Sequence, residues 1–162
     1  MKSCVFPGTF DPVTVGHLSV IERAARLFDQ VTVTLMVNVR KHCVFSLADR
    51  KRMMEKVCAP FPQVRVDVWD GLLADYMRIR GESCLIRGAR DAAEFEAEIK
   101  ADQVNRLLYP GMTTLLMPAE EGLGSVSSSM VRELAAFRAD IRPFVPACAA
   151  EEIARILSKE GT

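Results

Sequence analysis

One short segment near the start of the chain combines the residue types that a phosphate-handling site needs. Residues 8–17 read Gly-Thr-Phe-Asp-Pro-Val-Thr-Val-Gly-His, a turn rich in Gly and Pro that ends in a histidine. A turn that opens a helix presents unpaired backbone N–H groups and the positive end of the helix dipole, which favour phosphate. Gly16 lets a ligand approach the backbone closely, and His17 can add a hydrogen bond or a positive charge to a phosphoryl oxygen. The segment therefore predicts a phosphate site.

Two clusters of cations follow other apolar runs. Residues 40–42 read Arg-Lys-His and come after the run 31–37, while Arg87 and Arg90 come after the run 84–86. The planar fork of an arginine suits phosphate oxygens. A solvated basic loop in the first case, and two surface arginines at a turn in the second, are the simpler alternatives.

Three consecutive serines, at 127–129, open a further predicted helix. Serine hydroxyls and N-terminal N–H groups around one point would form a second phosphate cradle. Plain capping of the helix, with two spare serines, is the alternative.

The elements that must position these residues follow from the apolar periodicity. Strands are expected at 3–6, 31–37, 64–69, 84–86 and 113–117, and helices at 18–28, 47–58, 72–79, 91–107, 128–137 and, at the C-terminus, about 148–159. This alternation predicts an α/β fold, a Rossmann-like doubly wound parallel sheet of about five strands with helices on both faces. In such a sheet ligand groups collect at the carboxyl ends of the strands. We expect a single domain over residues 1–162.

Composition excludes several classes of protein. The 162 residues carry 21 basic and 21 acidic side chains, and this zero net charge argues against a dedicated nucleic-acid binder. The longest uncharged run, 107–119, is too short and too interrupted by Pro and Gly to cross a bilayer. Five scattered cysteines and the lack of an apolar leader predict a cytoplasmic protein with reduced thiols. Two histidines rule out a His-rich metal site.

Residues 14–17, Thr-Val-Gly-His, resemble the T/HxGH signature of the nucleotidyltransferase superfamily, and the longer run 7–17 resembles the bacterial phosphopantetheine adenylyltransferases. That family makes dephospho-coenzyme A from 4′-phosphopantetheine and ATP and releases pyrophosphate. Other family motifs match in order: Phe-Ser-Leu at 45–47, Arg-Gly-Ala-Arg at 87–90 with Phe-Glu-Ala-Glu at 95–98, and Val-Ser-Ser-Ser at 126–129.

The resemblance implies a role for individual residues. His17 and Lys41 would stabilise the pentavalent α-phosphate. The acceptor substrate would be contacted by Thr9, Lys41, Leu73 and Arg87. ATP would be contacted by Thr9, Phe10, His17, Gly88, Ala89, Arg90, Glu98, Leu123, Gly124, Ser125, Val126, Ser127, Ser128 and Ser129.

The resemblance also implies partners. They are ATP, 4′-phosphopantetheine, dephospho-coenzyme A and, as a further ligand, coenzyme A. Mg²⁺ would accompany ATP, held mainly by phosphate oxygens and water, with no metal site built by the protein alone. The family resemblance implies a homohexamer, and no membrane or nucleic-acid partner is expected.

Some positions depart from the family pattern and some alternatives remain. Val39 replaces a common proline, and Leu123 stands where an aromatic residue often lies near adenine. Leu73 can equally be a core residue. Transferases that act on nicotinate mononucleotide or a polyol phosphate share the first motif but differ in the arginine block and the last loop. A non-catalytic nucleotide sensor is opposed by the joint presence of His17, Lys41 and Arg87.

Two other nucleotide-using classes fit less well. A class I aminoacyl-tRNA synthetase shares the Gly-His pair, but this chain lacks room for a tRNA-binding region. A P-loop kinase is excluded because no Gly-x-x-x-x-Gly-Lys-[Ser/Thr] segment occurs.

Overall fold

The computed structural model describes residues 2–37 and 42–160. Its strands are β1 (Ser3–Gly8), β2 (Gln30–Val37), β3 (Val64–Asp70), β4 (Cys84–Ala89) and β5 (Thr113–Pro118). The helices are α1 (Val15–Leu27), α2 (Leu47–Cys58), α3 (Leu73–Arg80), α4 (Ala92–Leu108), α5 (Ser128–Ala136) and α6 (Ala147–Glu160), with a short 3₁₀ turn η1 (Arg142–Phe144). All strand pairs are parallel and their order is β3-β2-β1-β4-β5. The predicted doubly wound parallel sheet is confirmed.

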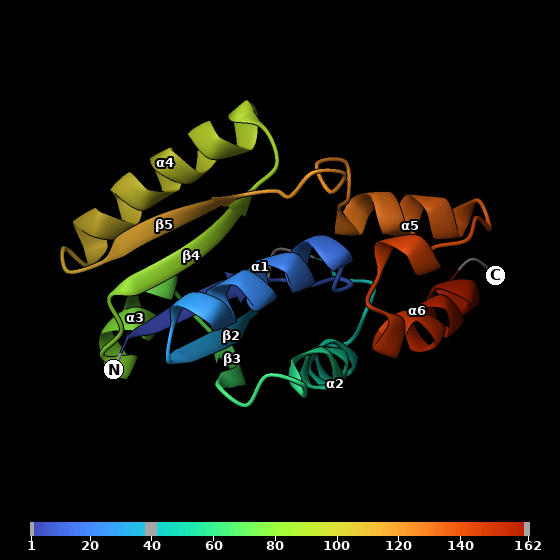
Figure 1. Cartoon of the computed structure of the whole chain (residues 1–162), viewed down its shortest axis with the longest axis horizontal. Helices are drawn as coiled ribbons and strands as arrows, with labels where there is room; N and C mark the ends of the chain where they lie inside the picture. Colours follow the sequence, from blue (N-terminus) through green and yellow to red (C-terminus); the bar gives the residue numbers. More distant parts are fainter. Residues whose placement is uncertain (1, 38–41, 161–162) are drawn as a thin grey trace.

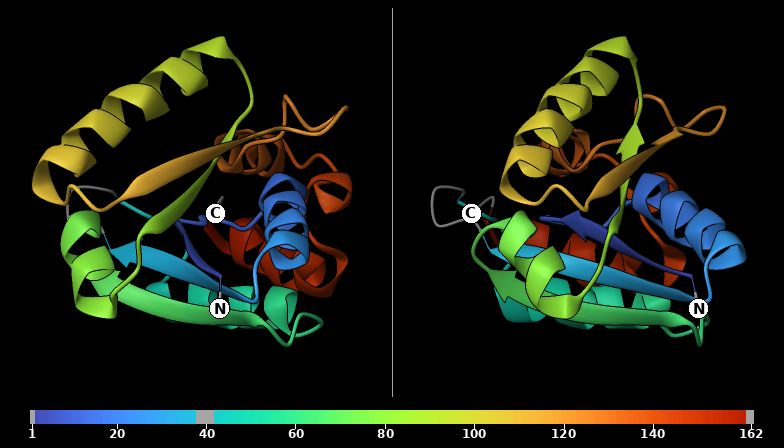
Figure 2. Two further views of the ribbon diagram at one scale, coloured as in Figure 1. Left: turned by 60° about the vertical axis from the view of Figure 1, so that its left-hand side comes forward. Right: turned by 90° about the vertical axis from the view of Figure 1, so that its left-hand side faces the viewer.

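Helices cover both faces of the sheet (Figure 1). Figure 2 shows α3 and α4 on one side of the sheet and α1, α2 and α6 on the other. Strand β1 contributes to both cores because side chains alternate along a strand. Cys4 and Phe6 belong to the larger core, while Val5 packs with Tyr76 and Leu85 in a smaller one. This burial on two faces explains why the strand is a continuous apolar run.

Two strands extend beyond their predicted ends. β4 was expected at 84–86, but Arg87, Gly88 and Ala89 continue it, paired with Leu116, Met117 and Pro118 of β5. β1 likewise runs to Gly8 instead of ending at residue 6. The apolar pattern does not extend to these ends, because their residues are polar or small. Backbone pairing with β5 supports the end of β4, and pairing with β2 supports the end of β1. The Arg87 side chain therefore projects from a strand and not from a loop.

The strand order reverses between β1 and β4. From β1 the chain winds through β2 to β3 in one direction, and then returns to place β4 on the other side of β1. Only one register pair, Val5 with Leu85, joins β1 to β4. Open α/β sheets bind ligands at such a reversal, at the carboxyl ends of the strands.

Polar side chains cap the starts of α1, α2, α4 and α5, whereas Leu72 before α3 provides no side-chain cap. Ser46 accepts a hydrogen bond from the Asp49 N–H at the start of α2, at 3.1 Å. The Asp49 carboxylate accepts from the Ser46 hydroxyl at 2.6 Å, so this cap is a variant of the capping box. Within the part of the chain that the structure describes, none of the helices has the length and apolar character that a transmembrane span requires.

Candidate active site

A cavity of about 700 Å³ lies at the reversal between β1 and β4. Its walls come from the turn between β1 and α1, the end of β4 with the first turns of α4, and the segment from β5 to the start of α5. It gathers most of the residues that the sequence predicted for the site, namely Thr9, Phe10, His17, Arg87, Gly88, Ala89, Arg90, Glu98, Leu123, Val126, Ser127, Ser128 and Ser129. Three segments far apart in the chain thus meet at one place.

Three predicted residues that the structure describes are not among those that line the cavity. Leu73 packs against the smaller core, whose members include Tyr76, so its contact with a substrate stays a prediction. Gly124 and Ser125 lie in the neighbouring loop but do not line the cavity. Lys41 falls outside the described residues.

His17 is held by a reciprocal pair of hydrogen bonds at the start of α1. The Thr14 backbone N–H donates to His17 Nδ1 at 3.0 Å, and the Thr14 hydroxyl oxygen accepts from the His17 N–H at 3.4 Å. Since a backbone N–H can only donate, Nδ1 must be the unprotonated nitrogen of the ring. The ring proton therefore sits on Nε2, which makes His17 a hydrogen-bond donor in its neutral form.

The surroundings of His17 keep its ring uncharged. Burial, followed by the positive charges of Arg87 and Arg90, lowers the pKa of His17 from 6.5 to about 4. The sequence left open whether this residue supplies a hydrogen bond or a positive charge. At neutral pH the first of these applies, because the imidazole is neutral there.

Aromatic packing fixes the other side of the ring. Phe10 stands edge-on to His17, with ring centroids 5.0 Å apart, and also packs against Phe6 at 5.5 Å. Phe10 reaches this position with a φ of 51°, a left-handed conformation that is strained for a bulky residue. Gly8 is required beneath it, because a Cβ there would lie 2.6 Å from the Phe10 ring.

Both predicted phosphate-binding arginines are paired with carboxylates of α4. Arg87 Nε and Nη2 donate to Glu98 at 2.9 and 2.6 Å, and Nη1 donates to the Pro7 carbonyl at 2.8 Å. Arg90 Nε donates to Glu94 at 3.1 Å and its Nη2 donates to the other oxygen of the same carboxylate. An anion that binds the paired N–H groups of either guanidinium must therefore displace a carboxylate, Glu98 from Arg87 or Glu94 from Arg90.

The three serines at the start of α5 line the cavity but have different partners. Ser127 caps the helix by accepting from the Met130 N–H at 3.0 Å. Ser128 donates to the Pro12 carbonyl at 2.7 Å, while Ser129 accepts from Arg132 at 3.3 Å. The N-terminus of α5 is thereby tied to the turn that precedes α1, and its first residues border the cavity.

Asp11 and Arg50 tie the first turn to the segment before α2. The Asp11 carboxylate accepts from the backbone N–H groups of Val44 and Phe45 at 3.1 and 2.8 Å. Arg50, which is buried, donates to the carbonyls of Phe45 and Thr9 at 3.2 and 2.8 Å. Asp11 is thus occupied in joining two loops of the site.

Some cavity residues were not found from the sequence. Glu120 follows β5 and Cys43 follows β2, so the strand-end rule points to both of them. Neither residue belongs to a motif of the resemblance. Ser19 also lines the cavity, and its position within α1 gives no signal of its own.

A divalent metal, which nucleotidyl transfer from ATP generally needs, finds few ligands from the protein alone. Among residues 2–37 and 42–160 no group of three or more His, Cys, Asp or Glu side chains is arranged to hold one. The exposed Glu120 carboxylate borders the cavity. One carboxylate together with phosphate oxygens and water is a donor set that suits Mg²⁺, so the residues fit a metal that arrives with a nucleotide.

Comparison with known proteins agrees with this geometry. Residues 5–134 match the model of the cytidylyltransferase-like family. A phosphopantetheine adenylyltransferase of Rubrobacter xylanophilus is 41% identical over 98% of this chain and 97% of its own length. Enzymes of the same name from Thiobacillus denitrificans (42% identical, 90% of this chain and 91% of the relative) and Alkaliphilus metalliredigens (36%, 99% and 100%) are also similar. The similarity extends over nearly the whole chain, across all the segments that form the cavity, and the chain therefore belongs to the phosphopantetheine adenylyltransferase family of cytidylyltransferase-like nucleotidyltransferases.

Proposed function

We propose that this chain transfers the adenylyl group of ATP to the phosphate of 4′-phosphopantetheine, giving dephospho-coenzyme A and pyrophosphate. A bond forms between an acceptor phosphate oxygen and the α-phosphorus, while the bond from the α-phosphorus to the bridging oxygen of pyrophosphate breaks. The observation that carries the proposal is the meeting of His17, Arg87 and Arg90 in one cavity of a chain with near full-length relatives of this activity.

The chemistry needs positioning and charge stabilisation more than covalent catalysis. No protein nucleophile is required, because the acceptor phosphate attacks. His17 would donate its Nε2–H to a non-bridging oxygen of the α-phosphate, where negative charge develops. Lys41, outside the described residues, would supply a positive charge to the same group. Thr9 would orient the attacking phosphate.

The two arginines would divide the substrates. Arg87 would bind the acceptor phosphate, and Arg90 with the N-terminus of α5 would bind the polyphosphate of ATP. Glu98 and the loop at 123–126 would contact the nucleoside, and Leu73 the pantetheine arm. Mg²⁺ would neutralise part of the polyphosphate charge when bound.

A coupled assay of pyrophosphate release tests the activity. We expect turnover with ATP and 4′-phosphopantetheine and none with nicotinate mononucleotide, the acceptor of the nearest rival reaction. Turnover with the second acceptor and not the first would assign the chain to another substrate.

We also infer that the chain forms a homo-oligomer, for which the resemblance implies six copies. α4 has no buried residue, and it exposes Phe95, Ile99, Val104 and Leu108 to 41–57%. Apolar side chains on one helix are typical of an interface between subunits. Light scattering after gel filtration should give a molar mass that is a multiple of the 18.0 kDa chain. Val104→Glu should lower this molar mass. A cytoplasmic location stays a prediction from the sequence.

A further inference from the structure

The guanidinium N–H groups of Arg90 already have hydrogen-bond partners within the protein. Its Nε and Nη2 both donate to the Glu94 carboxylate, its backbone N–H donates to Glu94 Oε2 at 2.9 Å, and its Nη1 donates to the Val126 carbonyl at 3.3 Å. Paired N–H groups that meet one carboxylate form the strong, planar contact that arginine makes with phosphate. Glu94 thus stands in the position that an anionic ligand of Arg90 would take.

Glu94 also occupies the N-terminus of α4. Its N–H donates to the capping residue Asp91 at 2.8 Å, which places Glu94 in the first turn of the helix. A negative charge there is favoured by the helix dipole. Hydrogen bonds from Arg90 lower the pKa of Glu94, so the carboxylate stays ionised. Two features that attract phosphate, the arginine fork and the helix start, are therefore neutralised by one side chain.

Among the residues that the structure describes, the lining of the cavity has no excess of positive charge to offer a polyphosphate. The described residues that line it include three arginines and four carboxylates, namely Arg87, Arg90 and Arg132 against Asp11, Glu94, Glu98 and Glu120. An incoming polyanion must therefore either bind against these carboxylates or take the place of one of them.

We propose that Glu94 is a built-in competitor for nucleotide polyphosphate, which takes its place on Arg90 when ATP binds. Glu94 thereby sets the affinity of the site for ATP and for pyrophosphate, and keeps both weak enough to leave. The acceptor phosphate is not affected, because Arg87 pairs with a different carboxylate, Glu98. This inference rests on the proposed function, in which Arg90 serves ATP.

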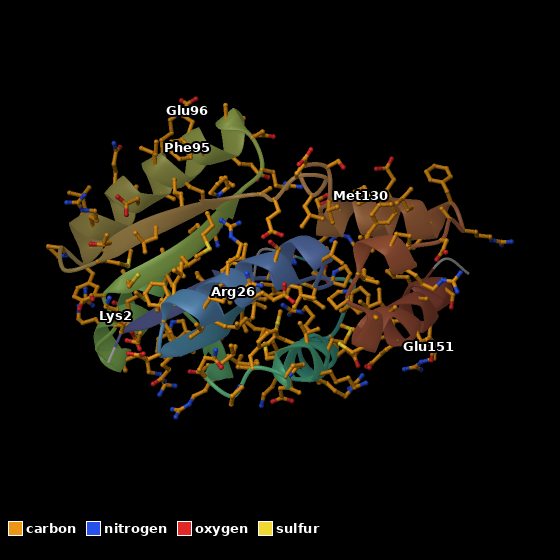
Figure 3. All side chains as sticks on the ribbon, in the orientation of Figure 1. Lys2, Arg26, Phe95, Glu96, Met130 and Glu151 are labelled. Atoms are coloured by element: carbon orange, nitrogen blue, oxygen red, sulfur yellow. The ribbon has the colours of Figure 1, made fainter. Side chains whose placement is uncertain are left out.

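Glu94→Gln tests the proposal, with Glu96→Gln as a matched control on the same helix. Glu96 projects outward from α4 (Figure 3) and pairs with Lys100 at 2.7 Å. Titration calorimetry would measure the Kd of ATP, pyrophosphate and 4′-phosphopantetheine for each protein. We expect Glu94→Gln to lower the Kd of ATP and of pyrophosphate by about tenfold, which corresponds to one charged hydrogen bond. The Kd of 4′-phosphopantetheine, and every Kd of Glu96→Gln, should stay within about twofold.

Unchanged or weaker ATP binding in Glu94→Gln would overturn the proposal. Glu94 would then serve to orient the Arg90 side chain for its ligand. Glu94→Asp retains the charge at the helix start but cannot reach the fork, so it should also tighten ATP if the first variant folds poorly. With Arg90→Gln already present, Glu94→Gln should no longer tighten ATP. If the wild-type enzyme turns over its substrates while Glu94→Gln fails to tighten ATP, only this inference fails. A wild-type protein that does not bind ATP refutes the proposed function as well.

Discussion

Acid should destabilise this protein through His17. The pKa of His17 is about 4 in the folded chain and 6.5 for the free side chain. The folded state therefore favours the neutral ring, and its contribution to stability is complete above pH 6.5. That contribution falls as the pH drops from 6.5 to 4 and is lost below pH 4. A difference of about 2.5 in pKa corresponds to about 3 kcal/mol, an upper limit because part of the ring faces the cavity.

The comparison of wild type with His17→Gln isolates this effect. Carboxylates that are paired in the folded state also gain protons in acid, but they do so in both proteins. Urea unfolding at pH values from 7 to 4 should show that wild type loses more free energy of unfolding than His17→Gln, by up to about 3 kcal/mol. His42→Gln, in which the other, exposed histidine is changed, should follow wild type.

Nitrogen NMR of the histidine rings gives a second readout. At pH 7 the Nδ1 of His17 should have the shift of an unprotonated nitrogen and Nε2 that of a protonated one, because Thr14 donates to Nδ1. Equal pH dependence of wild type and His17→Gln, or a His17 ring that titrates near 6.5, would refute the reasoning.

Other expected outcomes concern binding and stability. Arg87→Ala should weaken 4′-phosphopantetheine at least about tenfold and Arg90→Ala should weaken ATP by as much, since a charged hydrogen bond contributes about 1.5–3 kcal/mol; calorimetry that finds equal effects on both ligands would contradict the division of the site. Asp11→Asn should cost about 1–3 kcal/mol in urea unfolding, because the carboxylate accepts from two backbone N–H groups, and an unchanged midpoint would count against that role. Met53→Ala, in the fully buried core, should cost about 2–5 kcal/mol and lower Tm, whereas the exposed Leu27→Ala should change it little.

The fold was predictable because apolar periodicity indicates where most of its strands and helices lie. The strand at 31–37 and the helix at 47–58 are buried on the sides that the pattern indicates. The pattern fails where a strand continues with residues that are not large and apolar, as at Arg87 and Gly88. There the pairing with β5 supports the strand. The local sequence of β4 alone does not reveal this pairing, because β5 lies further along the chain.

The members of the site were predictable from their places after strands, but their partners were not. Nothing in the sequence shows that Glu98, eleven positions further on, reaches the fork of Arg87, because that contact depends on how α4 lies against β4. The sequence pattern does not predict the capping box at Thr14, because its second member is His17, where such boxes usually have Glu or Gln. In the segment Thr-x-Gly-His, the threonine caps the helix, and its backbone N–H fixes the tautomer of the histidine.

The single register pair between β1 and β4 has a consequence for folding. Strands β1 to β3 join through crossovers that are short in sequence, and so do β4 and β5. Contact between the two groups closes a much longer loop and comes at a greater cost in chain entropy. Since the cavity takes His17 from one group and Arg87 from the other, it is complete only when the two groups are associated. A ligand that contacts both groups of strands therefore stabilises their association, because its binding energy is gained only in the associated state.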